Sequence, residues 1–231
     1  LASRSGGKKP LEHYALRAQA PAASVFKLVT AAALLDLAQI DSAKLVCYSG
    51  GAQYLSASDI RGNGASDTTC ANLGDALGGS INAVIARLAF QNLSKEQLEE
   101  AALRFGFNRE IPFELPVDLS EALFVDDELE RARTAAGFWN VKLSPFHGAL
   151  LAAAIANHGV MMRPTLVDRI DDAAGNILYR HSPEVWLNSM SAAKADELAR
   201  LSESTTVSGT AAKTFQGRAD WPKALRVSGK T

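Results

Sequence analysis

The longest helical pattern of apolar residues runs over residues 24–40. This stretch contains no Gly and no Pro, and Ala and Leu dominate it. Ala fills most faces between the spaced apolar positions, so the pattern predicts a helix that is buried nearly all round. Pro21 stops this helix from extending backwards and leaves Ser24 in its first turn. The apolar positions at helical spacing are Phe26, Val29, Ala33, Leu34 and Leu37.

Shorter patterns predict the elements around this helix. Residues 11–18 alternate and predict a strand. Residues 41–71 are rich in Gly, Ser, Asp and Asn, and they predict a long irregular stretch with one short strand near 45–48. Such a stretch in a compact domain usually borders a functional site. Next come predicted helices over 73–77, 82–93, 94–106 (opened by a capping box at Ser94) and 126–136, with extended chain over 107–125.

The second half opens with a clearly capped helix. Ser144 is the expected N-cap, Pro145 lies in the first turn, and Gly159 is the expected C-cap residue. No internal repeat and no low-complexity linker interrupts the order, which predicts one compact unit. The later predicted elements are a β-hairpin of residues 160–169 and 176–180, an amphipathic helix over 191–204, and a strand from Leu225.

Composition narrows the class of protein. The 231 residues are 47% hydrophobic and 21% charged, as in a soluble globular protein of one large or two small domains. A net charge of -1 gives no electrostatic case for binding nucleic acid or an anionic membrane surface. The longest apolar runs, residues 31–35 and 149–156, are far shorter than the roughly 18 residues needed to span a bilayer. The abrupt start at Leu1 leads us to expect an upstream segment.

Cysteines and histidines give no metal signature. Cys47 and Cys70 predict either a disulfide in an oxidising compartment or two unrelated buried thiols, and the sequence leaves both readings open. No cofactor and no metal is implied. Four scattered histidines favour structural or surface roles over metal binding: His13, His147, His158 and His181.

Ser24 and Lys27 bring a hydroxyl and an amine together at the start of the central helix. They are one turn apart, so their side chains can meet. Partial burial lowers the pKa of such a lysine and suits it to act as a base. The backbone N–H groups of the first helical turn point outward beside them. The pair therefore predicts an acyl-transfer nucleophile.

The Ser-x-x-Lys pattern occurs twice more and is weak by itself. Ser5 and Lys8 lie in a Gly-rich stretch that predicts a solvated loop. Ser191, three residues before Lys194, precedes a helical stretch and fits an N-cap better. Neither copy has the buried helix start of Ser24.

Two further polar groups follow in a fixed order. Ser80 and Asn82 form the only Ser-x-Asn of the chain, in a turn between two predicted helices, where simple capping is the alternative. Lys230 and Thr231 close the sequence and alone would fit a solvated chain end. Together with the nucleophile pair, these groups resemble the signature of the penicillin-binding transpeptidases and related serine β-lactamases, which is Ser-x-x-Lys, Ser-x-Asn and Lys-Thr-Gly. Residues 137–139, 143–149, 156–160 and 207–211 extend the resemblance through most of the chain.

The resemblance implies an α+β fold, in which an antiparallel sheet carries helices on both sides. Residues 1–231 would be one penicillin-binding transpeptidase domain, with a mainly helical lobe over about 41–140. The family's third motif needs a glycine after Lys-Thr, whereas this sequence stops at Thr231. We therefore expect the domain to be incomplete at its C-terminus, without the closing strands and one of the two oxyanion N–H groups.

The resemblance also implies roles for the nucleophile pair. Ser24 attacks the D-Ala-D-Ala carbonyl of a peptidoglycan stem peptide, and Lys27 takes its proton. The Ser24 backbone N–H supplies part of the oxyanion hole. The acyl-enzyme then passes to an acceptor amine, which cross-links the cell wall, or to water.

The remaining motif residues are expected to bind and relay. Ser80 passes a proton towards the leaving amine, and Asn82 holds the substrate amide and steers the lysine. Lys230 and Thr231 bind the terminal carboxylate. The implied partners are stem peptides, β-lactam antibiotics and other cell-wall synthesis proteins, in an extracytoplasmic location. Any membrane anchor is expected only in segments outside this sequence.

Four alternatives stand beside this interpretation, and the second of them, a nucleotide-binding protein, is rejected. A class A β-lactamase needs a Glu-x-x-Leu-Asn segment, which Glu184 to Asn188 matches literally but at an unusual place in the order. Residues 224–231 fit a relaxed phosphate-binding loop, but such a loop must open a helix, and nothing follows Thr231 in this sequence. A DD-carboxypeptidase shares the acylation site, and a non-catalytic penicillin sensor or structural homologue would keep the fold.

Overall fold

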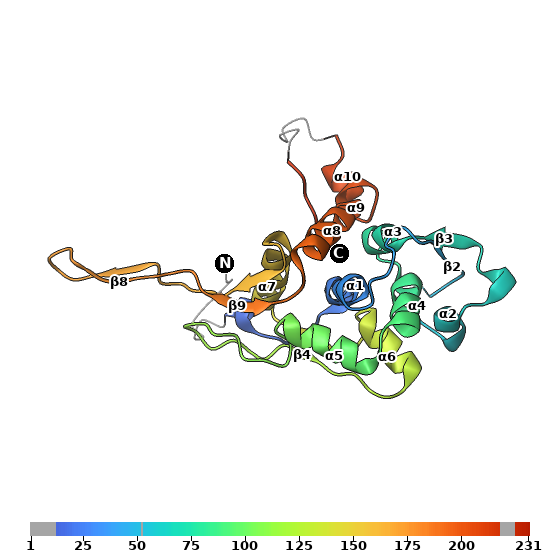
Figure 1. The fold of residues 1–231 in the computed structure, drawn as a ribbon, viewed down its shortest axis with the longest axis horizontal. Helices are drawn as coiled ribbons and strands as arrows, with labels where there is room; N and C mark the ends of the chain where they lie inside the picture. Colours follow the sequence, from blue (N-terminus) through green and yellow to red (C-terminus); the bar gives the residue numbers. More distant parts are fainter. Residues whose placement is uncertain (1–12, 52, 218–224) are drawn as a thin grey trace, which may run out of the picture.

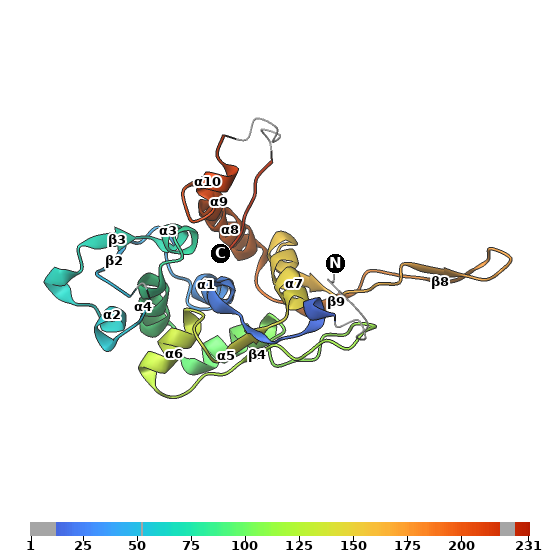
Figure 2. The ribbon, with the colours of Figure 1, turned by 180° about the vertical axis from the view of Figure 1, so that it is seen from behind.

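The computed structural model describes residues 13–51, 53–217 and 225–231. Its helices gather around α1 (Lys27–Asp36), and a thin two-stranded arm projects from one side of the molecule (Figure 1). The view from behind shows α1 between α5 (Lys95–Arg104) and α8 (Ala192–Ser202) (Figure 2). In both views the C-terminal end of the chain lies beside α1.

The predicted central helix is confirmed as two joined pieces. Ala23–Phe26 form a 3-10 helix, η2, which runs directly into α1. Every α1 residue before Asp36 is buried, because its small and aliphatic side chains allow α4 (Asn82–Asn92), α5 and α8 to pack on different faces. The helix ends earlier than predicted, since Gln39 has a φ of 50° and the chain turns away from the helix axis.

The capping signals mark helix starts correctly. Ser94 accepts a hydrogen bond from the Gln97 N–H, and the Gln97 side chain accepts one from the Ser94 N–H, so the capping box opens α5. Ser144 accepts from the His147 N–H at 3.1 Å, and Pro145 is the first residue of α7 (Pro145–Ala156). Further described helices are α2 (Ala57–Arg61), α3 (Leu73–Gly78), α6 (Glu128–Ala135), α9 (Ser204–Val207) and α10 (Ala212–Phe215), with 3-10 turns η1 (Tyr14–Leu16) and η3 (Gly64–Ser66).

The strands pair antiparallel, which together with the helices confirms the mixed α/β class. They form small sheets among the described residues. The central one has the order β1 (Ala20–Pro21), β5 (Val141–Leu143) and β4 (Glu121–Ala122). The other pairs are β2 (Val46–Tyr48) with β3 (Thr69–Ala71), β6 (Val160–Met162) with β9 (Val185–Asn188), and β7 (Arg169–Asp171) with β8 (Ile177–Arg180).

Three strand predictions need correction. Over the described part of residues 11–18 the chain forms the turn η1, because so short an alternation does not distinguish a strand from a 3-10 turn; residues 11 and 12 lie outside the described residues. The hairpin is confined to β7 and β8, since β6 pairs with β9. Residues 225–231 form no strand. Instead, Thr205 and Thr206 of α9 donate to their backbone carbonyls, and the Ser228 hydroxyl donates to the Ala199 carbonyl of α8.

The arm formed by β7 and β8 is exposed on both faces. Four of its apolar side chains are at least 42% accessible, namely Ile170, Ile177, Leu178 and Tyr179. In Figure 1 it extends away from the helices that surround α1. Within the described residues, the structure contains no helix of the length and apolar character that a membrane crossing needs.

Candidate active site

The structure brings Ser24, Lys27 and Ser80 into direct contact. The Lys27 Nζ lies 2.6 Å from the Ser24 Oγ, as the one-turn spacing predicts. The Ser80 hydroxyl donates to the same Oγ over 2.9 Å, although it is 56 residues away in the sequence. One serine oxygen is therefore held between an amine and a second hydroxyl, which is the arrangement that a proton-relayed nucleophile needs.

Lys27 is fully buried at the start of α1. Burial disfavours its cationic form, and the nearby Lys230 ammonium repels it, so the pKa of Lys27 falls from 10.5 to about 7. A large fraction of the amine is then neutral near pH 7. A neutral amine has a lone pair that can accept the Ser24 proton, which an ammonium group cannot do.

Ser80 and Asn82 form the first side of the site, which we call the α4 edge. Ser80 has a φ of 55°, an uncommon conformation for a residue with a side chain. This turn lets α3 end and α4 begin with Asn82 within a few residues. Both side chains are partly exposed, so they are accessible to a ligand while the Ser80 hydroxyl still touches Ser24.

Lys230 and Thr231 form the second side, which we call the C-terminal edge. The Lys230 ammonium donates to the Thr231 carbonyl at 2.6 Å, and the Ser80 hydroxyl lies 3.4 Å from the same oxygen. Partial burial lowers the pKa of Lys230 to about 8, so it is mainly cationic at neutral pH. The two edges therefore meet beside the nucleophile, with a cation and a hydroxyl on one of them.

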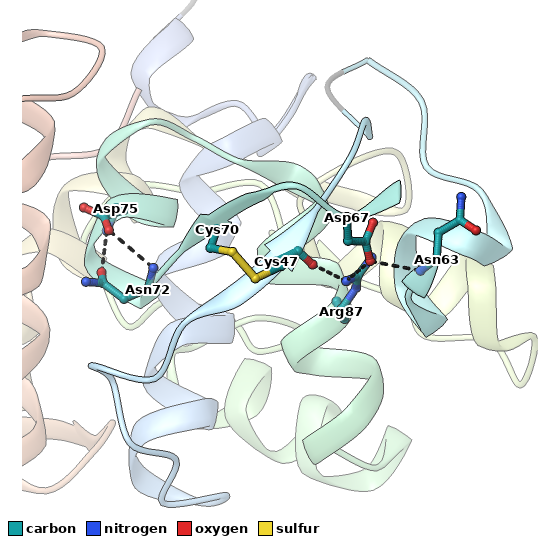
Figure 3. Close-up of a disulfide and its surroundings, with 7 residues drawn as sticks. All are labelled: Cys47, Asn63, Asp67, Cys70, Asn72, Asp75 and Arg87. Atoms are coloured by element: carbon teal, nitrogen blue, oxygen red, sulfur yellow. Dashed lines mark hydrogen bonds and ion pairs between the residues drawn. A yellow bond between two sulfur atoms is a disulfide. The ribbon is translucent and has the colours of Figure 1, made fainter. Parts of the chain in front are cut away.

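A covalent and ionic cluster fixes the α4 edge (Figure 3). Cys47 and Cys70 form a disulfide across β2 and β3, which settles the question that the sequence left open. Arg87, on α4, pairs with Asp67 at 2.7 Å and donates to the Cys47 carbonyl and, at 2.7 Å, to the Asp59 carbonyl. The guanidinium holds the pKa of Asp67 below its usual value. The helix that begins with the Ser-x-Asn motif is thereby tied to the disulfide-linked strands.

Two glycine contacts in the site were not predicted. A Cβ on Gly137 would lie 2.0 Å from the Ala23 carbonyl oxygen, so only glycine allows this turn to pack against the residue before Ser24. Ala23 itself has a φ of 47°. A Cβ on Gly209 would lie 2.2 Å from the Gly78 oxygen. Both contacts join segments far apart in the sequence, and the only local signal was the presence of the glycines.

Other candidate residues lie elsewhere. The Glu184 carboxylate pairs with Arg163 at 3.0 Å, its side chain is 60% exposed, and none of its described contacts involves the site. Ser191 occupies the N-cap position of α8 but donates its hydroxyl to Asp36, while Lys194 pairs with a glutamate on its own helix. Residues 5 and 8 lie outside the described residues.

The histidines take structural positions where their contacts are described. His147 is buried, its Nε2 bonds the Phe105 carbonyl at 2.7 Å, and burial lowers its pKa. His158 pairs with Asp196. Over residues 13–51, 53–217 and 225–231, no group of three or more His, Cys, Asp or Glu side chains is placed to hold a metal ion.

Comparison with known proteins gives a consistent family. The sequence model of the penicillin binding protein transpeptidase domain matches residues 2–231. The peptidoglycan D,D-transpeptidase PbpA of Mycobacterium tuberculosis is 28% identical over 165 residues, or 68% of this chain and 33% of that protein. The chain thus spans about a third of the length of the curated relatives that it matches.

Solved structures share the fold. A ceftriaxone acyl-enzyme complex of penicillin-binding protein A from M. tuberculosis superposes with a TM-score of 0.78 at 23% identity, covering 96% of this chain and 49% of that one. The D,D-transpeptidase domain of a peptidoglycan glycosyltransferase from Eggerthella lenta gives 0.73 at 26% identity, covering 91% and 52%. This chain belongs to the penicillin-binding protein transpeptidase family. Domains of this family act on the cell wall.

Proposed function

We propose that this protein is a peptidoglycan DD-transpeptidase that forms an acyl-enzyme on Ser24. The observation that carries the proposal is the contact of the Ser24 Oγ with both the Lys27 amine, at 2.6 Å, and the Ser80 hydroxyl, at 2.9 Å. A serine so placed has a base on one side and a proton donor on the other. Family membership and the β-lactam acyl-enzyme complexes of structural neighbours support the same chemistry.

In the proposed acylation, the neutral Lys27 amine accepts the Ser24 proton as the Oγ attacks the D-Ala-D-Ala carbonyl of a stem peptide. The Ser24 backbone N–H, in the first turn of η2, stabilises the developing oxyanion. The proton then passes through the Ser80 hydroxyl to the leaving amine. D-Ala leaves, and the acyl group stays on Ser24.

The two edges would hold the substrate during this step. Asn82, at the start of α4, hydrogen-bonds the substrate amide and orients Lys27. Lys230 and Thr231 bind the terminal carboxylate, because an ammonium group and a hydroxyl are suitable donors to an anion. The acceptor amine of a second stem peptide then takes the acyl group, which forms the cross-link.

We further propose that residues 1–231 belong to one transpeptidase domain, with residues 41–140 as its helical lobe. The five helices α2 to α6 fall in that range, which supports the division. The disulfide between Cys47 and Cys70 supports an extracytoplasmic location, since disulfides persist in oxidising compartments. Other proteins of cell-wall synthesis are proposed partners.

Intact mass and peptide mapping after incubation with benzylpenicillin, on the protein extended past Thr231, test the proposal. We expect a lasting adduct on the Ser24 peptide and none in Ser24→Ala. Ser191→Ala is the matched control, because Ser191 also stands in a Ser-x-x-Lys pattern but donates to Asp36. A stem-peptide donor with an amine acceptor should then give a cross-linked product and released D-Ala.

Other outcomes point to the alternatives. Hydrolysed peptide without cross-linked product would indicate a DD-carboxypeptidase. An adduct that clears quickly would indicate a β-lactamase. Absence of any adduct on the folded protein would refute the acyl-enzyme mechanism and favour a non-catalytic homologue.

A further inference from the structure

Thr210 connects the C-terminal edge of the site to the end of α3, just before the α4 edge. Its backbone N–H donates to the Gly78 carbonyl at 3.0 Å, two residues before Ser80, and its hydroxyl lies 3.4 Å from the same oxygen. That hydroxyl also hydrogen-bonds the Thr231 hydroxyl. Gly209 fixes the approach, since a Cβ there would collide with the Gly78 oxygen. Thr210 as a whole residue is exposed.

The hydrogen bonds around Thr210 show which neighbour can receive its hydroxyl proton. Its hydroxyl has one proton and can donate to one neighbour at a time. The Gly78 oxygen already accepts the Thr210 N–H, and a hydroxyl contact of 3.4 Å is at the long limit for a hydrogen bond. The contact with Thr231 is the closer of the two. The Thr210 proton is therefore available to Thr231 without leaving the Gly78 carbonyl unpaired.

We propose that Thr210 is a positioning residue that donates its proton to the Thr231 hydroxyl when a carboxylate-bearing ligand is bound, so that Thr231 directs its own proton at the carboxylate. A carboxylate only accepts, so Thr231 must donate to it and must take its own hydrogen bond from Thr210. Without ligand, the chain of protons can run the other way, from Thr231 through Thr210 to Gly78. This inference rests on the proposed function, in which Thr231 binds the substrate carboxylate, and it makes Thr210 a determinant of selectivity for that group.

Acylation by benzylpenicillin and by its methyl ester tests this inference, because the ester lacks the anionic carboxylate. Thr210→Val removes the hydroxyl but keeps the shape and the N–H bond to Gly78. We expect it to slow acylation by benzylpenicillin about five- to tenfold and acylation by the ester less than about twofold, each relative to the unchanged protein. Thr210→Ser should restore the rate with benzylpenicillin. Thr214→Val, an exposed threonine on neighbouring α10, is the matched control.

Each outcome decides the question. An equal loss with both probes would assign Thr210 a general structural role and overturn the inference, as would no loss with either. If the unchanged protein forms no adduct with either probe, the proposed function itself fails and this inference falls with it. If Thr210→Val lowers the melting temperature, Thr210→Ala removes the same hydroxyl without adding an apolar branch and replaces it in the comparison.

Discussion

The α4 edge and the C-terminal edge of the site are held by different kinds of interaction. A disulfide and the ion pair between Arg87 and Asp67, whose side chains are 7% and 9% exposed, fix the strands beside α4. The C-terminal edge is held by hydroxyl-to-carbonyl bonds, such as the one from Thr206 to Val227 at 2.6 Å and the one from Thr205 to Gly229 at 2.9 Å. Its one described ion pair, between Arg226 and Glu203, is largely exposed at the arginine.

The different interactions at the two edges match the different roles proposed for them, which are proton relay and ligand binding. The α4 edge carries the hydroxyl that touches Ser24, and a relay must stand at a fixed distance from its nucleophile. The C-terminal edge offers Lys230 and Thr231 to an anionic ligand, and a charge attracts over a longer range. The α4 edge, which takes part in proton transfer, is therefore held rigidly, whereas weaker bonds hold the C-terminal edge, which binds the ligand.

The largest effect is expected between the two edges, at Lys27. Lys27→Met should slow acylation by about a thousandfold, because it removes the base and leaves both edges in place. The variant should be no less stable, since Met avoids the cost of burying an amine. Stopped-flow acylation and thermal unfolding measure the two effects. If Lys27→Met lowered the melting temperature substantially, the loss of rate would come from a damaged fold, and Lys27 would have a structural role.

The sign of the stability effect can be checked with pH. The pKa of Lys27 is about 7 in the folded protein and 10.5 ordinarily, so between these values the unfolded chain binds a proton that the folded one does not. Stability due to this group therefore increases as pH rises through that window. Lys27→Met should remove this increase.

The next largest effect concerns the α4 edge. Arg87→Met removes the ion-pair partner of the Asp67 carboxylate, whose side chain is 9% exposed, and we expect the melting temperature to fall by roughly 10 °C. Arg61→Met is the matched control, because its pair with Glu128 is exposed, and it should change the melting temperature by less than about 2 °C. Equal effects of the two variants would contradict a special role for the buried pair.

The pH dependence of acylation should distinguish the base Lys27 from the C-terminal edge. The rate with benzylpenicillin is expected to rise about tenfold per unit up to pH 7, as Lys27 loses its proton, and to fall above pH 8, as Lys230 loses its own. The methyl ester should keep the low-pH limb and lose the high-pH limb. A fall above pH 8 with both probes would assign that limb to another group.

The smallest effect is expected at the C-terminal edge. Thr206→Val removes the bond to the Val227 carbonyl, and acylation by benzylpenicillin should slow by about threefold with little change in melting temperature. The same substitution at exposed Thr214 should change neither quantity. A large drop in melting temperature on Thr206→Val would show that this edge is as firmly built as the other.

The parts that the sequence predicted are those with local signals. Helix starts follow from residues a few positions apart, as at Ser94 and Ser144, and the contact between Ser24 and Lys27 follows from helical spacing. The approach of Ser80 to this pair is non-local and was expected only from the family resemblance.

The features that the sequence did not predict depend on contacts between residues far apart in the sequence. The packing of Gly137 on the Ala23 carbonyl and of Gly209 on the Gly78 carbonyl joins distant segments, and a glycine alone does not identify its neighbour. The Leu225 segment has the composition of a strand, but a strand requires a partner, and this depends on the arrangement of the other elements.

The disulfide also bears on the order of folding. Its cysteines are 23 residues apart, and both precede α4 in the sequence. A chain that emerges N-terminus first exposes both thiols to an oxidant before the arginine of α4 has appeared, so the covalent link can close while the ionic one is still impossible. In the chain-entropy model, a closed loop of this size lowers the conformational entropy of the unfolded chain, and this raises the free energy of unfolding by about 3 kcal/mol. β2 and β3 would then already be covalently linked when α4 is synthesised, and α4 would pack against them.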